Sequence, residues 1–521
     1  MHRRLIFPSV VIGSLTAVFL VAHPKADNPK NDFGLFIAHE LAAHSEQLFG
    51  FSNPLQESAI GPFDGADNTQ AIVVAPGLKV SLVSSSVASA ADQIALWPND
   101  NNPRYLFVCD EETSNPAVQR VDLLAPPASN ATTIVTGLSS CDPVRRTPWG
   151  TIIVAEEAGA TGGLYEILDP AGITTPISVT DRGAGTTSDP AHLVKRKAVG
   201  SLSFESFAIR PDGTMIYGDE LAPGAVSQGS AGGALYKFVP LVPYTGTGQP
   251  PVTQAQLSPL ASGSVFGLRV AANGSSNWGQ GAEVGKGRWV AIDTAPAGVV
   301  DANGNIILRN AQVLQKFTGY YRPEDMDIDP IARDNGVFRA CWANTGRLNF
   351  AGGSTVENSA VHGEIMCIVE EPSTTTPPAP TGTIPVVSRF IVGSQQAGMF
   401  DNVAFQPHTG NLVVLEDGPT SIVLPDGTQQ PRGNDLWICL PDGDDDDTLS
   451  DGCVRFASIK DTSAEPTGFI FLGSGESAFV NIQHRAVNDA AGNTNHGALV
   501  KISGFKIKKD HDDDDFEHHK Q

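Results

Sequence analysis

Carboxylate side chains recur in pairs along this chain, each time directly after a short apolar segment. Asp110-Glu111, Glu156-Glu157, Asp219-Glu220 and Glu416-Asp417 are the four pairs. Clustered carboxylates repel one another and cannot all stay ionised without compensation. Bound cations are the usual compensation, and oxygen-rich clusters suit calcium. One pair alone would be an ordinary solvated loop, but the recurrence favours a shared metal-binding centre.

The acidic pairs belong to a longer repeat that predicts a three-stranded unit. In the clearest copy, Glu205 precedes an apolar strand, Asp212-Gly213 supplies a turn, and a second strand runs into Asp219-Glu220. An Asp-Gly dipeptide tolerates the positive φ angles that tight hairpin turns need. A variable loop then leads to a third strand that begins at Gly233.

Six stretches of the chain fit this repeat. Their first strands begin at or just after Asp92, Cys141, Glu205, Glu324, Asn402 and Glu465. Six repeats of short antiparallel strands predict an all-β fold: a six-bladed β-propeller with an N-terminal helix and inserted loops and strands. A β-sandwich with coincidental turns is the alternative, and the recurring acidic pair argues against it. The 53 glycines and 37 prolines agree with a turn-rich β protein.

The propeller would gather the repeated carboxylates at one place. In an antiparallel hairpin, the start of one strand lies beside the end of the next. Equivalent positions of all blades then converge at one mouth of the central channel. One expected ring contains Cys141, Glu205, Glu324, Asn402 and Glu465. A second expected ring contains Glu156-Glu157, Asp219-Glu220 and Glu416-Asp417.

Cys141 is the one cysteine in the expected rings, whose other members carry carboxylate or amide groups. A thiolate among carboxylates would recruit a softer transition metal, although a single cysteine is more often buried and inert. The chain has six cysteines and no CxxC motif, which argues against a zinc ribbon. Cys439 and Cys453 flank an acidic loop and could pair, as could Cys341 and Cys367.

Net charge and hydropathy limit which partners and which cellular location are expected for the protein. The net charge of -23 argues against nucleic acid or an anionic membrane as a partner. A basic start followed by the apolar run Leu5–Ala22 predicts a cleaved export signal, so we expect a periplasmic or extracellular protein without stable membrane insertion. An uncleaved anchor is the alternative.

The expected organisation of the 521 residues has four parts. They are an export signal at 1–26, a segment with one helix at 27–74, a propeller at 75–505 with an insert at about 240–319, and an acidic, His-rich disordered tail at 506–521. The helix is expected over Phe33–Phe49. The very acidic loop Asp442–Asp451 fits a solvated loop and a peripheral calcium site equally well.

Several motifs resemble those of the PhoX-type alkaline phosphatases. Thr147-Pro148-Trp149-Gly150-Thr151 followed by Glu156-Glu157, with Cys141 upstream, resembles one element of that family. Arg322-Pro323-Glu324 resembles another, and Asp401–Phe405 and Glu465–Gly468 resemble later ones. The matches run in order over most of the chain. Asp142–Arg146, after the cysteine, depart from the small residues usual there.

The resemblance implies an exported six-bladed propeller that hydrolyses phosphomonoesters with a calcium and iron cluster. It implies that Cys141 is an iron ligand, and that Arg322 holds the substrate phosphate, for which a planar guanidinium is suited. The same residue placed beside Glu324 would also make a simple surface ion pair. The remaining implied metal ligands are Glu156, Glu157, Glu205, Asp219, Glu220, Glu324 and Glu416.

Two other functions fit the carboxylate repeat. A calcium-dependent propeller lactonase would also use a carboxylate and amide centre, for which Asn402 and Asn481 are suited, but it would not need Cys141 or Arg322. A non-enzymatic surface protein stabilised by calcium is the other alternative. The expected partner in the leading hypothesis is a small phosphorylated substrate.

Overall fold

The structure is a computed structural model of the whole chain. It describes residues 35–59, 68–112, 117–222, 232–246, 252–270, 280–281, 283–346, 362–373, 381–394, 396–418, 421–423, 429–443, 447–462, 464–483 and 497–507. The predicted export signal, His484, Asp444–Asp446 and the tail from residue 508 onward lie outside these ranges.

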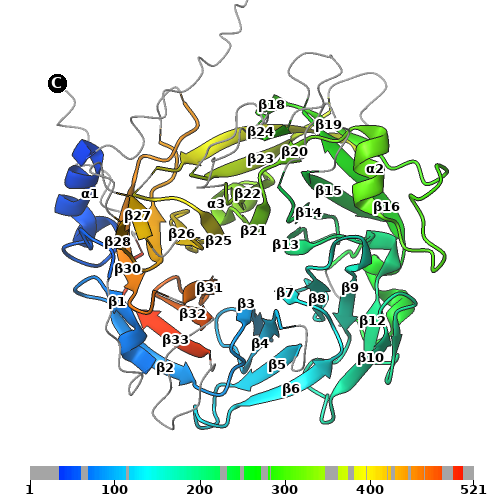
Figure 1. Cartoon of the computed structure of the whole chain (residues 1–521), viewed down its shortest axis with the longest axis horizontal. Coiled ribbons are helices and arrows are strands. Elements are labelled where there is room, and N and C mark those ends of the chain that lie inside the picture. The colour runs from blue at the N-terminus through cyan, green and yellow to red at the C-terminus, as the bar shows by residue number, and fades with distance from the viewer. Residues whose placement is uncertain are drawn as a thin grey trace, which may run out of the picture.

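Six sheets stand around a central axis, so the predicted six-bladed propeller is confirmed (Figure 1). The first blade runs outward through β3 (Ala91–Trp97), β4 (Tyr105–Asp110), β5 (Val118–Asp122) and β6 (Ala131–Thr136), with β10 (Ile177–Asp181) and β11 (Thr186–Thr187) outermost. The second contains β7 (Cys141–Arg146), β8 (Ile152–Glu156), β9 (Leu164–Ile167) and β12 (Leu193–Lys195).

The middle blades absorb most of the predicted insert. The third blade contains β13 (Phe204–Ile209), β14 (Met215–Asp219), β15 (Gly233–Pro240), β16 (Gly263–Arg269) and β19 (Arg288–Ala291), with β17 (Gln280–Gly281) and β20 (Gly319–Tyr320) alongside. The fourth contains β21 (Pro323–Ile328), β22 (Arg339–Asn344), β23 (Glu364–Pro372), β24 (Thr383–Val392) and β18 (Gly285–Lys286). Helix α2 (Leu308–Gln315) packs outside the third blade (Figure 1).

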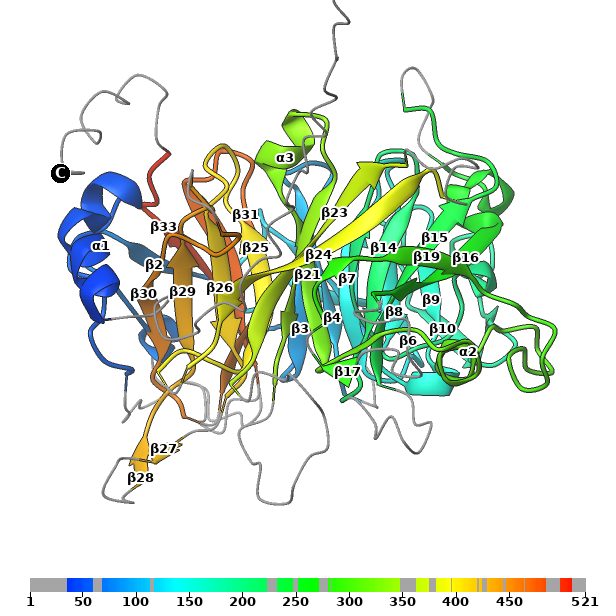
Figure 2. The same cartoon turned by 90° about the horizontal axis from the view of Figure 1, so that it is seen from above.

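The last two blades are completed by strands from the start of the described chain. The fifth contains β25 (Phe400–Phe405), β26 (Leu412–Glu416), β29 (Asp435–Cys439) and β30 (Cys453–Ile459), and its outer strand is β1 (Ile72–Val74). The sixth contains β31 (Glu465–Phe471), β32 (Ser477–Gln483) and β33 (Ala498–Ser503), and its outer strand is β2 (Lys79–Ser84). A small hairpin, β27 (Ser421–Val423) and β28 (Gln429–Pro431), projects from the fifth blade (Figure 2).

Helices are few in the described residues. The N-terminal helix α1 (Leu35–Leu48) lies within the range predicted for it and packs beside the fifth blade (Figure 1). The fourth blade differs from expectation. The repeat predicts the second strand of this blade from Val337, but the strand begins at Arg339. The short helix α3 (Pro330–Asp334), capped by Asp329, occupies the hairpin connection before it.

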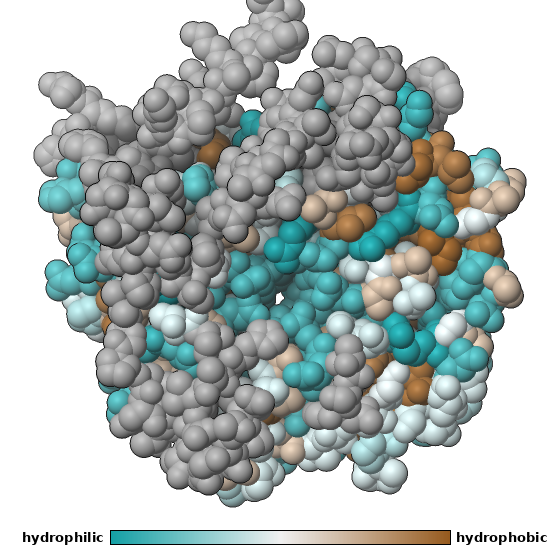
Figure 3. All heavy atoms as spheres, in the orientation of Figure 1, coloured by the Kyte–Doolittle hydropathy of each residue, from teal (hydrophilic) through white to brown (hydrophobic). Residues whose placement is uncertain are grey.

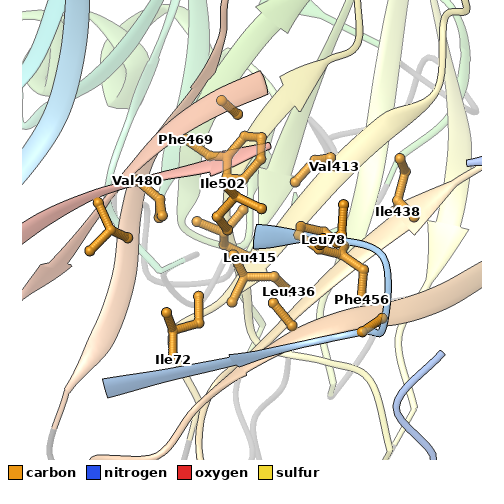
Figure 4. Packing of buried hydrophobic residues seen from close by; sticks show 14 of the residues in the cluster. Ile72, Leu78, Val413, Leu415, Leu436, Ile438, Phe456, Phe469, Val480 and Ile502 are labelled. Carbon is orange, nitrogen blue, oxygen red and sulfur yellow. The ribbon is translucent and has the colours of Figure 1, made fainter. Parts of the chain in front are cut away.

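Apolar side chains from facing sheets hold neighbouring blades together. Between the fifth and sixth blades, Val413, Leu436 and Phe456 pack toward Phe469 and Ile502, as Figure 4 shows. Both faces of these strands are buried, which accounts for their nearly continuous runs of β-branched and aromatic residues. The Asp212-Gly213 turn forms as predicted, with Gly213 at a φ of 90°.

All six inner hairpins share one irregularity. In each blade the pairing between the inner strand and the second strand slips near the start of the inner strand, as after Ala91, Cys141 and Phe204. The other slips follow Pro323, Phe400 and Thr467. A bulge of this kind leaves an extra residue in one strand and changes the direction in which a side chain points. The fold therefore contains a six-fold repeated device for aiming side chains.

Candidate metal centre

The bulges determine which acid of each inner strand meets the others. Ala91, Cys141 and Phe204 pair with the last residue of the second strand, and the residue that follows each of them is Asp92, Asp142 and Glu205. The same position in the fourth and fifth blades is Glu324 and Asp401. In the sixth blade it is Gly468, whose φ of 60° suits glycine.

A second set of acids comes from the ends of the second strands. Glu111, Glu157, Glu220 and Asp417 each follow directly after β4, β8, β14 or β26. The fourth blade has Thr345 at this position, and its hydroxyl donates to Glu324 at 2.8 Å. Both sets therefore lie at the same end of the inner hairpins, as the repeat predicts.

Three triads of carboxylates result, each with ligand oxygens within 4.8 Å of one another. They are Asp92, Glu111 and Asp142; Glu157, Glu205 and Glu220; and Asp401, Asp417 and Glu465. The triads form one cluster. Asp142 and Glu205, from two different triads, share a hydrogen bond. The charges of Asp401 and Glu465, in the third triad, raise the pKa of Asp92. Hydrophilic side chains surround the central opening in Figure 3.

Burial and mutual repulsion raise the pKa values of these carboxyl groups. Burial, reinforced by neighbouring carboxylates, raises the pKa of Glu157 to about 9 and that of Glu111 to about 7. The same causes, burial first, raise the pKa well above its usual range for Asp92, Asp142, Glu205, Glu324, Asp401 and Glu465. Without added positive charge, the cluster would hold protons at neutral pH.

Arg322 supplies positive charge within this cluster. Its Nε donates to Glu220 at 2.6 Å, and its Nη2 lies 2.9 Å from a carboxylate oxygen of Glu324. The charges of Glu324 and Glu220 raise the pKa of the guanidinium, so it stays protonated. The Arg322 side chain is 31% exposed, and its backbone has a φ of 55°, which is uncommon for a residue with a side chain.

Arg145 links the inner strands of several blades. It donates to Asp325 at 2.5 Å and to Gln93 at 2.7 Å, and the Val403 amide donates to the other oxygen of Asp325. These four residues come from four different blades. Arg145 and Asp327 also line a cavity of about 360 Å³. These hydrogen bonds therefore tie the inner strands of four blades together.

In three of the four pairs, the first acid has a different role from the one predicted. Glu156 pairs with Arg182 at 2.5 Å, Asp219 with Arg309 at 2.8 Å, and Glu416 with Arg432. All three carboxylates are fully buried. We therefore correct the assignment of Glu156, Asp219 and Glu416 as metal ligands: each is fully buried against its own arginine, and none belongs to a triad.

These first acids also fix the backbone near the cluster. Glu156 accepts hydrogen bonds from the amides of Ser139 and Gly163, at 2.9 and 3.0 Å. Glu416 accepts from the Gly398 and Asp435 amides and from the Trp437 indole, each at about 3 Å. They position the strand ends that carry the second acids.

The assignment of Cys141 as a metal ligand is also corrected. Its sulfur is bonded to Cys109, and the residue is fully buried in the apolar layer between the first two blades. Because of the bulge, the neighbouring Asp142 takes the inward position that we assigned to Cys141. Asp401 replaces Asn402 for the same reason, and Asn402 instead donates to Asp401 and accepts from the Gly468 amide.

The structure thus brings together only part of the predicted set. Glu157, Glu205, Glu220, Glu324 and Arg322 meet in the cluster. Six further acids of the cluster were not among the predicted ligands: Asp92, Glu111, Asp142, Asp401, Asp417 and Glu465, the last of which the repeat places only in the first expected ring. The signal for Glu111 and Asp417 was present, because each is the second acid of a repeated pair. The signal for Asp142 was its position beside a residue already singled out.

The Thr-Pro-Trp-Gly-Thr motif lies at the opposite end of the β7–β8 hairpin from the cluster. The Trp149 indole and the Thr151 hydroxyl donate to Glu166 at 2.7 and 2.6 Å, and Arg196 pairs with the same carboxylate. All four residues are buried. This motif therefore stabilises the second blade and does not contact the site.

The donor atoms of the cluster fit a hard cation. Its ligands are carboxylate, hydroxyl and amide oxygens. Oxygens of Asp92, Asp142 and Asn481 are buried without a hydrogen-bond partner among the described residues. Such atoms are unfavourable unless a cation or water satisfies them. A thiolate-ligated iron does not fit, because all six cysteines form disulfides.

The fold and the site together define a six-bladed propeller with a candidate carboxylate metal centre. The family model described as alkaline phosphatase PhoX matches residues 30–486. The chain therefore belongs to the PhoX alkaline phosphatase family, which comprises metal-dependent phosphomonoester hydrolases. A search of curated proteins found no match.

A comparison with solved structures gave several matches, of which the first shares the fold. Pseudomonas fluorescens PhoX, in complex with the transition-state analogue vanadate, is 16% identical, with a TM-score of 0.57; the match covers 88% of this chain and 98% of that one. The PQQ domain of Coprinopsis cinerea pyranose dehydrogenase is 10% identical over 85% of this chain and 100% of that one, with a TM-score of 0.40. A Xanthomonas campestris gluconolactonase is 12% identical over 86% and 97%, with a TM-score of 0.38.

Proposed function

We propose that this chain hydrolyses small phosphate monoesters at the carboxylate cluster, with Arg322 holding the substrate phosphate. The observation that supports this most strongly is the placement of Arg322 between Glu220 and Glu324, at the edge of the three triads. A guanidinium held in this way is already oriented, so little freedom is lost when phosphate binds. Nη1 makes no hydrogen bond to a described residue and remains for a phosphate oxygen.

Calcium is the cation that the donor set supports. The proposed ligands are the members of the three triads together with Glu324, all hard oxygen donors. Iron, which the family resemblance implies, would have to be held by the same oxygens and not by sulfur. When bound, the cations would neutralise phosphoryl oxygens and lower the pKa of a water nucleophile. The protein's own part is to hold the phosphate at Arg322.

We also propose that the protein is exported. Three disulfides involve all six cysteines, and disulfides persist in oxidising compartments. In the described part of the chain, no helix combines the length and apolarity needed to cross a bilayer. Fractionation of cells that express the full chain, followed by N-terminal sequencing, tests whether residues 1–26 are removed.

Hydrolysis of p-nitrophenyl phosphate by the purified protein, with and without calcium after chelation, tests the main proposal. We expect Arg322→Ala to lower kcat/KM by about 100-fold or more, since one lost charge-stabilising donor costs that much in comparable sites. Arg322→Lys should not restore it, because lysine lacks the planar fork. Arg333→Ala is the matched control: that arginine is exposed and pairs with its neighbour Asp334.

Two results would contradict the proposal. One is wild-type turnover by the Arg322→Ala variant. The other is a calcium-bound protein that hydrolyses lactones and leaves phosphate esters intact, which would favour a lactonase. Elemental analysis of the same preparations determines whether calcium, iron or both are bound.

A further inference from the structure

We infer that the Cys109–Cys141 disulfide is a positioning device for the metal centre, holding Glu111 and Asp142 at ligand distance. This inference rests on the proposed function of the cluster as a cation site. The disulfide joins residues 32 positions apart in the sequence. It reaches from the end of β4 in the first blade to the first residue of β7 in the second.

The placement of the two sulfurs connects them directly to cluster acids. Cys141 immediately precedes Asp142, and Cys109 lies two residues before Glu111. Asp142 and Glu111 belong to the same triad, together with Asp92. Each half of the disulfide is therefore within two residues of a proposed ligand on its own strand.

Backbone pairing does not fix this distance. β4 and β7 belong to different sheets, and no ladder of hydrogen bonds joins them. Three carboxylates within 4.8 Å repel one another when they are ionised, as they must be to bind a cation, so the ionised triad tends to spread. A covalent link between the two blades opposes this spreading and keeps the oxygens arranged for a cation. Preorganisation of this kind increases affinity by lowering the ordering cost of binding.

The other two disulfides provide the contrast. Cys341–Cys367 and Cys439–Cys453 each join directly opposed residues of neighbouring strands within one blade. Cys439 pairs with Leu412 at the start of β26, whereas Asp417 follows the other end of that strand. Removal of this disulfide leaves the triads untouched, so it is the matched control.

Calcium titration calorimetry on the full chain, with thermal melting as a separate measurement, tests the inference. We expect Cys109→Ala/Cys141→Ala to weaken calcium binding about 10-fold, as loss of residues that orient metal ligands commonly does. Cys439→Ala/Cys453→Ala should lower the melting temperature and leave calcium affinity within twofold. Cys109→Val/Cys141→Ala also lacks the disulfide but refills the apolar volume. If it loses as much calcium affinity as Cys109→Ala/Cys141→Ala, the loss is not caused by a cavity.

Two outcomes would overturn the inference. The first is wild-type calcium affinity in both blade-linking variants. The second is a Cys109→Ser protein, with Cys141 freed, that binds iron more tightly and shows sulfur-to-metal absorption, since Cys141 would then be a ligand. Binding is measured without turnover, so a wild-type protein that binds calcium but hydrolyses no phosphate ester contradicts the proposed function alone.

Discussion

At the residue scale, the carboxyl groups of the triads must either hold protons or bind cations. Glu157 shows this most clearly: burial and the nearby Glu220 raise its pKa to about 9. In the unfolded chain the same group would ionise near its usual value of about 4.3. At pH 8 the metal-free protein therefore keeps a proton that unfolding releases, and this difference lowers its stability.

Glu157→Gln should consequently separate stability from metal binding. We expect the metal-free variant to be more stable than wild type at pH 8, because the neutral amide removes the proton-linked penalty, by at least about 1 kcal/mol. Its calcium affinity should fall at least about 10-fold. Urea unfolding with and without calcium measures both effects. Glu476→Gln, at an exposed glutamate, should change neither.

The identity of individual ligands was only partly predictable from the sequence. The recurrence of acidic pairs located the cluster, but the hairpin repeat does not tell which of two neighbouring residues faces the channel. A one-residue bulge decides this, and it replaced Cys141 with Asp142 and Asn402 with Asp401. Pairing of Glu156 with Arg182 depends on a contact 26 residues away, which a local motif does not contain.

At the scale of elements, the hairpins β7–β8, β13–β14 and β25–β26 use their two acids for different tasks. The first acid pairs with an arginine and anchors the backbone, and the second faces the cluster. Asp219 and Glu220 show this division: Arg309 binds both oxygens of Asp219 and also donates to the Glu220 carbonyl at 3.1 Å. The arginine therefore holds the end of β14 in place.

Arg309→Ala should destabilise the protein by about 3 kcal/mol, because it leaves the buried Asp219 carboxylate unpaired. Adding Asp219→Asn to that variant should recover part of the loss, since the amide carries no charge to bury. Chemical denaturation of wild type, both single variants and the double variant completes the cycle. Additive effects in this cycle would mean that the pair does not act as a unit.

At the scale of the whole molecule, the carboxyl groups at the channel mouth should make the metal-free protein less stable as pH rises. The raised pKa values of Glu111 and Glu157, about 7 and 9, mean that the metal-free fold takes up protons relative to the unfolded chain. Its stability is therefore greatest below about pH 4.5 as far as these groups are concerned, and it falls as pH rises through 7 and 9.

Melting curves of chelated protein between pH 5 and 9 test this expectation. The melting temperature should fall across the range, and saturating calcium should remove most of the fall, since a bound cation favours ionised ligands. A flat profile for the chelated protein would show that the cluster carries no proton-linked penalty. An unchanged profile after calcium addition would argue against cation binding there.

The number of blades was predictable because each blade carries its own copy of the repeat. The way in which the ring closes was not, because β1 and β2 are short strands outside the repeat pattern. They pair with β30 and β33, which lie almost at the other end of the chain. No periodicity in the sequence connects segments so far apart.

That closure also sets an order of events during biosynthesis. β2 pairs with residues 499–503, so its partner leaves the ribosome only after all six inner hairpins have been made. Until then β2 has no strand edge to join, and the sixth blade lacks its outer strand. The ring closes only once β33 has been synthesised and β2 can pair with it.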